Sequence, residues 1–216
     1  MNSNKFFTTA TIAKIAIISA ISYVLMLFSF PIPFIPPFYS LDFSEVAVLI
    51  GGFSLGPLAA VIIEALKNIL KAMTGTNTAY VGELANFIIG CALCVPASII
   101  YKKNKTKKGA IIGFIVGGAI MTLVGVIMNY FVLLPAYSVF FKLDMDKIIA
   151  IGTAIVPLIK DKLTFVLLAT TPFNIVKSIV IGTVTFVLYK HISPLLKKIV
   201  KTLFSIAQSF EPEKLS

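Results

Sequence analysis

The chain has 216 residues, of which 58% are hydrophobic, and its mean hydropathy is +0.98. A soluble domain of this size is seldom more than half apolar, so the composition excludes an ordinary soluble protein and indicates a polytopic helical membrane protein. Arginine is absent, and the net charge of +10 comes from lysines that stand mostly between apolar stretches and near the C-terminus. This placement fits orientation by cytoplasmic positive charge better than it fits nucleic-acid binding.

The first apolar stretch, about Thr8–Phe30, is long enough to cross a bilayer as one helix. It is longer than the apolar region of a cleavable signal peptide, so we expect a span that is retained. Within it, Ala13, Ala16 and Ala20 recur at helical spacing. Small residues at this spacing let another helix approach closely, and that helix could belong to this chain or to a partner.

A proline-rich segment follows, with four prolines among residues 31–37. Proline lacks an N–H and biases the residue before it toward extended backbone, so we expect ordered, non-helical structure here. Asp42, with Glu45 three residues later, matches an acidic capping box and predicts a helix that begins at Asp42. The whole segment is either a lid over a cavity or a surface loop between two spans.

Two shorter apolar segments come next, about Phe43–Phe53 and Pro57–Met73. The first rises only about 16 Å as a helix, so the two form either one kinked crossing or a hairpin of two crossings. Five lysines crowd residues 102–108 and should lie in the cytoplasm. Only the hairpin places that loop, the N-terminus and the basic C-terminal region on one side. It predicts six transmembrane helices, cytoplasmic termini and an extracellular proline-rich loop.

The remaining spans are predicted at about Ala79–Tyr101, Gly109–Tyr137 and Thr171–Tyr189, with Ser138–Thr170 as a long external connection. The last span should begin with Thr171 as its N-cap, because a proline follows directly. The fifth span carries glycines at helical spacing, which predict a close-packing face: Gly109, Gly113, Gly117 and Gly118.

The transmembrane domain is predicted to cover residues 1–191, and residues 192–216 form a basic tail. Apolar residues of this tail recur at three- and four-residue intervals, with lysines on the opposite side. The pattern is typical of an amphipathic helix on the cytoplasmic membrane surface, with a disordered basic tail as the alternative.

Polar side chains inside the predicted spans fall at one depth. Glu83 and Asn86 lie in the first turns of the fourth span, and Asn174 and Lys177 lie in the first turns of the sixth. Asn129 lies about 30 Å from the cytoplasmic start of the fifth. Because polar groups within a membrane are costly, their convergence beneath the proline-rich loop predicts a binding site. The alternative is a set of helix-end residues that reach toward the interface.

Other polar residues are interpreted as structural. Glu64, Lys67 and Asn68 have the spacing of partners on one helix face, and we expect an internal ion pair with an amide. Cys91 and Cys94 stand in an apolar run, where packing is a better interpretation than metal binding or redox chemistry.

Several catalytic classes lack their motifs in this sequence. There is no phosphate-binding loop of the form G-x-x-x-x-G-K-[ST] and no H-E-x-x-H motif, and the chain has one histidine. The polar layer also lacks a pair of catalytic groups. We therefore expect a binding protein that is not an enzyme and has no metal or cofactor of its own.

Six stretches taken together resemble one transporter family: FPIPF, PPFYSLDFSEV, IGGFSLGPLA, GELANF, MNYFVLLPAY and PFNIVK. They are similar to the riboflavin-specific S components of energy-coupling factor (ECF) vitamin transporters, over Thr8 to about Tyr189. The resemblance implies six transmembrane helices in a bacterial cell membrane and an external loop that caps a vitamin site. It also implies assembly with a transmembrane coupling protein and two ATPases, which use the ATP.

The resemblance assigns roles to particular residues. Ala16 and Ala20 are implied to face the coupling protein. The implied contacts to the vitamin are Tyr39, Leu41, Asp42, Glu83, Asn129, Asn174 and Lys177. The chemistry agrees, because a flavin has an edge of alternating donors and acceptors that asparagine amides can match. The alternatives are an S component for another vitamin or for a flavin such as FMN, and a membrane enzyme or anchor.

Overall fold

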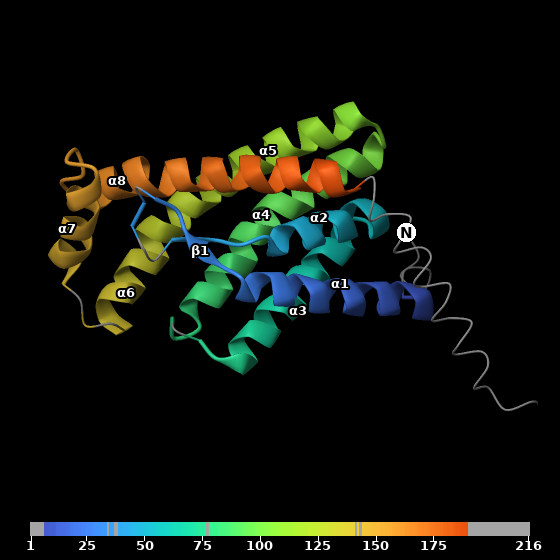
Figure 1. Ribbon diagram of the computed structural model, residues 1–216, viewed down its shortest axis with the longest axis horizontal. Helices are drawn as coiled ribbons and strands as arrows, with labels where there is room; N and C mark the ends of the chain where they lie inside the picture. The colour runs from blue at the N-terminus through green and yellow to red at the C-terminus, as the bar shows by residue number, and fades with distance from the viewer. Residues whose placement is uncertain are drawn as a thin grey trace, which may run out of the picture.

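The computed structural model describes residues 7–189, apart from positions 34, 37, 38, 77, 141 and 143. Almost all of this part is helical. The helix α1 and the final helix run along the longest axis, and α3, α4 and the helix from α5 to α6 run obliquely to it (Figure 1). The first five helices are α1 (Thr9–Leu27), α2 (Ser44–Leu55), α3 (Pro57–Thr74), α4 (Val81–Lys103) and α5 (Lys107–Met128). The predicted tail and the predicted domain boundary at residue 191 lie outside the described residues.

The second half of the chain contains two helices that are longer than expected. One runs from α5 through a π-helical turn, η2 (Asn129–Leu133), into α6 (Leu134–Phe140). The separate α7 (Met145–Ile155) follows. The final helix, Lys162–Tyr189, contains α8 (Lys162–Phe165), a second π-helical turn η3 (Val166–Thr170) and residues 171–189.

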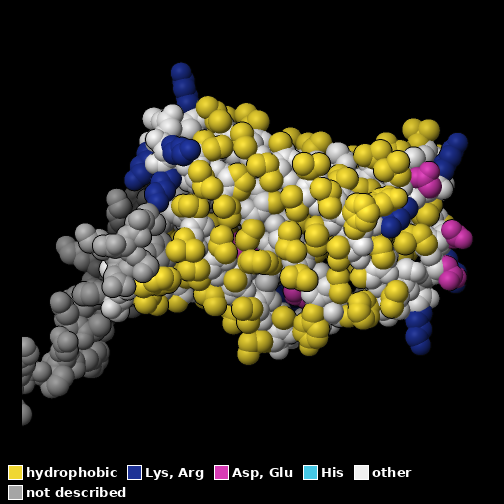
Figure 2. Space-filling model, turned by 180° about the vertical axis from the view of Figure 1, so that it is seen from behind, with side chains coloured by type: hydrophobic (Ala, Val, Ile, Leu, Met, Phe, Trp, Pro, Cys, Tyr) yellow, Lys and Arg dark blue, Asp and Glu magenta, His cyan; other side chains and the backbone are white. Residues whose placement is uncertain are grey.

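Four helices in the described part are long and apolar enough to cross a membrane: α1, α4, Lys107–Phe140 and the final helix. The segment α2 has only 12 residues, and α3 carries Glu64, Lys67 and Lys71 among its 18. Hydrophobic side chains cover the middle of the molecular surface, and lysines gather at its two ends (Figure 2). The structure is therefore that of a multi-pass membrane protein.

The segments α2 and α3 form a hairpin. Gly56 separates them with φ of 102°, a value that only glycine adopts easily, and Pro57 occupies the first turn of α3. The two helices run in opposite directions (Figure 1). Of the two arrangements that the sequence allowed, the single kinked crossing is thus wrong, because the chain reverses at Gly56.

An aromatic cluster closes one end of the bundle. The ring of Phe53, at the end of α2, lies 4.5 Å from Tyr101 of α4 and 5.8 Å from Tyr189 of the final helix. The Tyr101 hydroxyl donates a hydrogen bond of 3.3 Å to the Tyr189 hydroxyl. The lysine-rich turn between α4 and α5 lies at this same end (Figure 1). We call it the lysine end, and the opposite end, where α7 lies, the cavity end.

The segment between α1 and α2 is non-helical where it is described, as its prolines predict. Two short strands, β1 (Phe30–Pro31) and β2 (Ser40–Leu41), pair antiparallel there. The expected capping box at Asp42 and Glu45 is wrong. The N-cap of α2 is Phe43, and Asp42 instead accepts a hydrogen bond of 2.9 Å from the Ser44 N–H. Glu45 turns away because two buried lysines attract its carboxylate.

The predicted glycine face of the fifth span packs against α4. A Cβ atom added to Gly113 would lie 2.9 Å from the carbonyl oxygen of Ala97, and one added to Gly117 would collide with the carbonyl of Leu93. The two backbones therefore approach more closely than any larger residue allows.

The final helix begins nine residues earlier than predicted. Asp161 caps it, since its carboxylate accepts from the Thr164 N–H while the Thr164 hydroxyl accepts from the Asp161 N–H. Thr171 is therefore not an N-cap, and the external connection is shorter than Ser138–Thr170. The proline after Thr171 lies inside the helix.

Each π-helical turn ends two residues before a proline, Pro135 after η2 and Pro172 after η3. Proline supplies no N–H and clashes with the carbonyl four residues earlier, so the preceding helical turn must deform. At the second site the Thr171 hydroxyl donates to the Val166 carbonyl at 3.2 Å. Single π-helical turns of this kind often occur at functional sites. Residues of η2 line the cavity described next, and η3 lies just before Phe173 and Asn174, which also line it.

Candidate functional site

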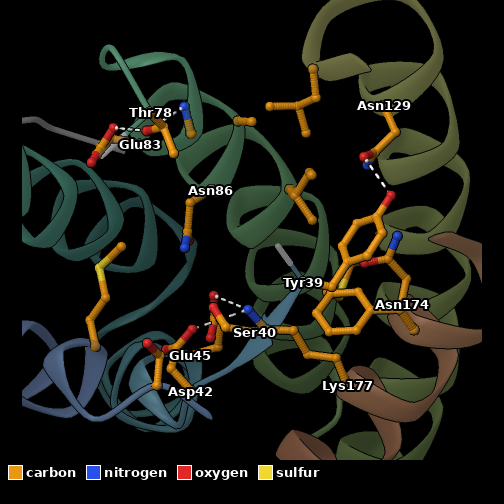
Figure 3. Close-up of a pocket in the computed structure, with 18 of the residues that line it drawn as sticks. Tyr39, Ser40, Asp42, Glu45, Thr78, Glu83, Asn86, Asn129, Asn174 and Lys177 are labelled. Carbon is orange, nitrogen blue, oxygen red and sulfur yellow. Dashed lines mark hydrogen bonds and ion pairs between the residues drawn. The ribbon is translucent and has the colours of Figure 1, made fainter. Parts of the chain in front are cut away.

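A cavity of about 310 Å³ lies at the cavity end, which is large enough for a small organic ligand. It is bordered by the α1–α2 connection, four helices of the first half and both helices that carry π-helical turns. Six of the seven residues predicted to contact a ligand line it (Figure 3): Tyr39, Asp42, Glu83, Asn129, Asn174 and Lys177. The convergence predicted from depth along the spans is therefore present in the fold.

Leu41 is the exception. It is buried, with 5% of its surface exposed, but it lies outside the set that lines the cavity. Its neighbours Ser40 and Asp42 line the cavity instead. Tyr39 lines the cavity as well, so three of the four residues 39–42 face it and Leu41 packs into the protein interior. A contact between Leu41 and a ligand therefore stays a prediction.

One side of the cavity is built from amides. The Asn129 Nδ2 donates 2.8 Å to the Gly125 carbonyl, and its Oδ1 accepts 2.9 Å from the Tyr39 hydroxyl. The same hydroxyl lies 2.5 Å from the Thr170 hydroxyl of η3. Burial raises the pKa of Tyr39, so this phenol stays protonated and able to donate. Tyr39 thus joins the proline-rich loop to both π-helical turns.

Asn174 faces the same side and has a free donor. Its Nδ2 is buried and has no hydrogen-bond partner among the described residues. The side chain lies over Gly125, where an added Cβ would collide with it. A buried amide without a partner is costly unless a ligand satisfies it, so this donor points to an occupant of the cavity.

The cavity floor is charged. The Lys177 Nζ lies 3.4 Å from Asp42 Oδ2 and 3.2 Å from Glu45 Oε1. Glu45 Oε1 also lies 3.3 Å from Lys67 Nζ, which in turn donates 2.8 Å to the Ser44 hydroxyl. Lys177 therefore pairs with the two carboxylates of the loop and α2.

Below the floor, the ion pairs continue into the protein interior. Lys67 Nζ lies 3.1 Å from Glu64 Oε2, and Asn68 Nδ2 donates 3.3 Å to the same oxygen. The expected internal ion pair with an amide is confirmed. Cys94 is fully buried beside Glu64, with its sulfur 3.9 Å from Oε1, which agrees with the packing role expected for the cysteines.

A third group lies across the cavity from the amides, in the α3–α4 turn (Figure 3). Glu83 Oε2 accepts from the hydroxyls of Thr76 at 2.9 Å and Thr78 at 2.8 Å. One turn further along α4, the buried Asn86 Oδ1 has no partner among the described residues. This side offers acceptors, whereas the amide side offers the unpaired Asn174 donor.

Sequence reasoning placed Asn86 in the polar layer beside Glu83, and Asn86 does line the cavity. It missed other lining residues, among them Ser40 and Glu45. Glu45 was assigned to a capping box, and no local sequence signal shows that this residue, in the first turn of α2, lies beside two buried lysines. Ser40 stands between Tyr39 and Asp42, two predicted residues of the same loop, and that position was its only signal.

Among the described residues, no group of three or more His, Cys, Asp or Glu could hold a metal ion. The cavity instead combines fixed donors and acceptors with apolar walls, including Ile89, Met121, Leu133 and Phe173. Such a lining suits the recognition of a flat, partly apolar molecule with polar edges. A family model described as the substrate-specific component of ECF transporters matches residues 10–189.

The chain belongs to this family of ECF S components. The riboflavin transporter RibU of Staphylococcus aureus (strain TCH60) is 37% identical, over 92% of this chain and 96% of the relative. The riboflavin transporter FmnP of Bacillus subtilis (strain 168) is 34% identical, over 83% and 90%. Both are named as transporters, and this S component is a transport protein, not an enzyme.

A solved structure, described as "Structure and mechanism of the S component of a bacterial ECF transporter", has the same fold. Its TM-score is 0.67 and its sequence identity is 35%, with 91% of this chain and 99% of that chain covered. Ala16 and Ala20 of this S component are exposed on α1, while Ile15, Ile18 and Ser19 face the core. The two alanines are thus available to a partner, which argues against internal packing.

Proposed function

We propose that this S component binds riboflavin in the cavity and passes it to an ECF module for ATP-driven uptake. The observation that carries the proposal is the amide side, where Asn129 and Asn174 come from two helices, each beside a π-helical turn. The names of the relatives support the same ligand. The pyrimidinedione edge of a flavin alternates acceptors with a donor, and amides can complement both.

In this proposal the flavin ring lies between the apolar walls, with its polar edge at Asn129 and Asn174. The ribityl hydroxyls then extend toward Glu83, Thr78 and Asn86, where acceptors are available. The amide side and the acceptor side lie on opposite sides of the cavity (Figure 3), as a ligand with two polar ends requires.

The test is a titration of the detergent-purified protein with riboflavin, followed by flavin fluorescence. The chain has no Trp, so the flavin is the natural reporter. We expect saturable binding of one riboflavin per chain. FMN and thiamine serve as competitors of related and unrelated chemistry. A protein that binds no riboflavin, or binds thiamine equally well, would refute the proposal.

We further propose that α1 docks on the coupling protein through Ala16 and Ala20, and that this protein and two ATPases complete the transporter. The exposure of both alanines supports this surface, because small side chains allow close helix approach. Ala16→Leu and Ala20→Leu should keep riboflavin binding and weaken co-purification with the coupling protein. Normal assembly of both variants would show that α1 does not dock on the coupling protein through these two alanines.

The fold also supports a proposal of six membrane-crossing helices, with α2 and α3 counted as crossings and the lysine end in the cytoplasm. The N-terminal end of α1, the α2–α3 break and the lysine-rich turn lie at one end of the bundle (Figure 1). With Cys91 and Cys94 replaced, a cysteine introduced at Ser40 should react with an impermeant thiol reagent in intact cells. One introduced at Thr106 should resist it, and the opposite pattern would invert the topology.

A further inference from the structure

A long groove lies on the outside of the bundle, where α5 and the final helix pack against each other. Its volume is about 930 Å³, and it is separate from the cavity. Small residues form its floor: an added Cβ at Gly118 would lie 3.0 Å from the Ser178 hydroxyl, and one at Gly182 would lie 3.4 Å from the Phe114 ring. The helices therefore approach closely, and the larger side chains stand on either side of a furrow.

The walls of this groove are apolar and face outward. Ile115, Leu123 and Ile179 each expose more than half of their surface. Three of the four hydroxyls in the groove are bonded to backbone carbonyls of their own helix. Thr122 donates 2.8 Å to Gly118, Thr171 donates 3.2 Å to Val166, and Ser178 donates 2.9 Å to Ile175. An occupant would find almost no free hydrogen-bonding group, so a hydrocarbon chain fits better than a polar ligand.

The groove ends beside two lysines. Lys107 lies one helical turn before Ile111, the first lining residue of α5, and on the same face, and Lys108 lies three residues before it. Both lysines are exposed. Neither α5 nor the final helix contains an Asp or a Glu, so an anion at this end meets positive charge without a competing carboxylate.

The length of the groove also fits a lipid. The lining residues of α5 run from Ile111 to Val126, a rise of about 22 Å. Half of a bilayer's hydrocarbon core is about 15 Å thick. The groove is therefore longer than one leaflet is thick. An acyl chain of one leaflet can lie entirely within it, with its headgroup at the level of the lysine end.

We propose that this groove is a binding site for an anionic phospholipid, with an acyl chain along α5 and the final helix and the phosphate group at Lys107 and Lys108. The site is independent of the vitamin cavity. It would fix the contact between the two helices that supply Asn129 and Asn174, and would make the protein's stability depend on anionic lipid.

The experiment uses the absence of Trp from the chain. A single Trp is introduced in the groove by Phe186→Trp. The matched control is Ile99→Trp, an exposed position on α4 near the lysine end but outside the groove. The full chain is reconstituted in phosphatidylcholine, and quenching is measured as brominated phosphatidylglycerol or brominated phosphatidylcholine is added.

At the groove Trp we expect half-quenching at about a tenfold lower fraction of brominated phosphatidylglycerol than of brominated phosphatidylcholine. The preference arises because two lysines lie near the phosphate of the anionic lipid. The control Trp should show a much smaller preference. Lys107→Gln with Lys108→Gln should reduce the groove's preference to that of the control. Equal preference at both Trp positions would mean ordinary surrounding lipid and would refute the site. Protection of the groove Trp from both lipids would also refute it, since a second copy of the chain would then cover the groove.

Discussion

The two ends of this bundle bury polar groups in different ways. At the lysine end the rings of Phe53, Tyr101 and Tyr189 cluster, and the two tyrosine hydroxyls bond to each other. The buried Thr185 hydroxyl, one turn before Tyr189, has no partner in the described part of the chain. At the cavity end three carboxylates and two lysines share a chain of ion pairs, while Asn86 Oδ1 and Asn174 Nδ2 have no partner in the described part of the chain.

This difference indicates that the lysine end serves mainly the stability of the bundle, whereas the cavity end serves binding. Aromatic rings and hydroxyls close the lysine end, where the described residues form no buried ion pair. The cavity end keeps charges and amides away from water, which is favourable only where each group is paired. Asn86 and Asn174 line the cavity, so a bound molecule can satisfy their unpaired atoms, and the ends should respond differently to the same kind of substitution.

The largest effect is expected from Lys67→Met. Lys67 is fully buried between Glu45 and Glu64, and its removal leaves two carboxylates without their common cation. Breaking such a pair costs about 3–5 kcal/mol of unfolding free energy. Thermal unfolding in detergent measures it, with the exposed Lys103→Met at the lysine end as the control, expected within about 0.5 kcal/mol of wild type.

A second variant separates charge from packing at this site. In Lys67→Met the Glu45 carboxylate keeps its ion pair with Lys177, whereas Glu64 loses the lysine that pairs with it. Adding Glu64→Gln removes that unpaired charge, so the double variant should be more stable than Lys67→Met alone. If the double variant is as unstable as the single one, the loss comes from lost packing of the lysine stem, and the ion pairs contribute little.

A smaller but more selective effect is expected from Gly125→Ala. The added methyl group would collide with Asn174 and displace its amide from the cavity. Losing one well-placed hydrogen bond costs about 1–3 kcal/mol, or roughly a 5- to 150-fold loss of riboflavin affinity. Gly118→Ala makes the same change on the same helix outside the cavity and should bind normally. Equal losses in both variants would point to a general disturbance of helix packing.

The smallest effect is expected from Tyr39→Phe, which removes the hydroxyl that joins Asn129 and Thr170. Each lost hydrogen bond should cost about 0.5–1.5 kcal/mol of stability at neutral pH. Because burial raises the pKa of Tyr39, its protonated form stabilises the fold below its ordinary pKa of 10.0. That stabilisation is lost as the pH rises through the raised value in the folded protein.

This prediction is tested by measuring the unfolding midpoints of wild type and Tyr39→Phe at neutral pH and at pH values above the pKa of free tyrosine. Wild type should lose more stability than the variant over this interval. Parallel curves would show that Tyr39 does not titrate in this range or is not coupled to folding.

The helices and the depth of the polar layer could be predicted because they depend on local composition. Apolar length identifies the spans, and the rise per residue places Asn129, Asn174 and Lys177 near one another. Apolar length alone could not predict the α2–α3 hairpin. It was inferred from charge, because only two crossings place the lysines of residues 102–108 on the same side as both termini.

The errors share a physical cause, which is that a local motif had a tertiary competitor. Glu45 fits a capping box, but Lys67 and Lys177 are remote in sequence and bind it more strongly. Thr171 and the proline after it fit a helix start, but Asp161 and Thr164 cap the helix earlier, and a π-helical turn accommodates the proline.

The most direct test of the central claim is to titrate Asn129→Ala and Asn174→Ala with riboflavin. The claim is that these two amides bind the flavin edge. The control is Tyr101→Phe, which loses a hydroxyl at the lysine end. Each asparagine variant should lose roughly 5- to 150-fold in affinity, while Tyr101→Phe binds as wild type does. Unchanged affinity in both asparagine variants would contradict the account and place the vitamin elsewhere.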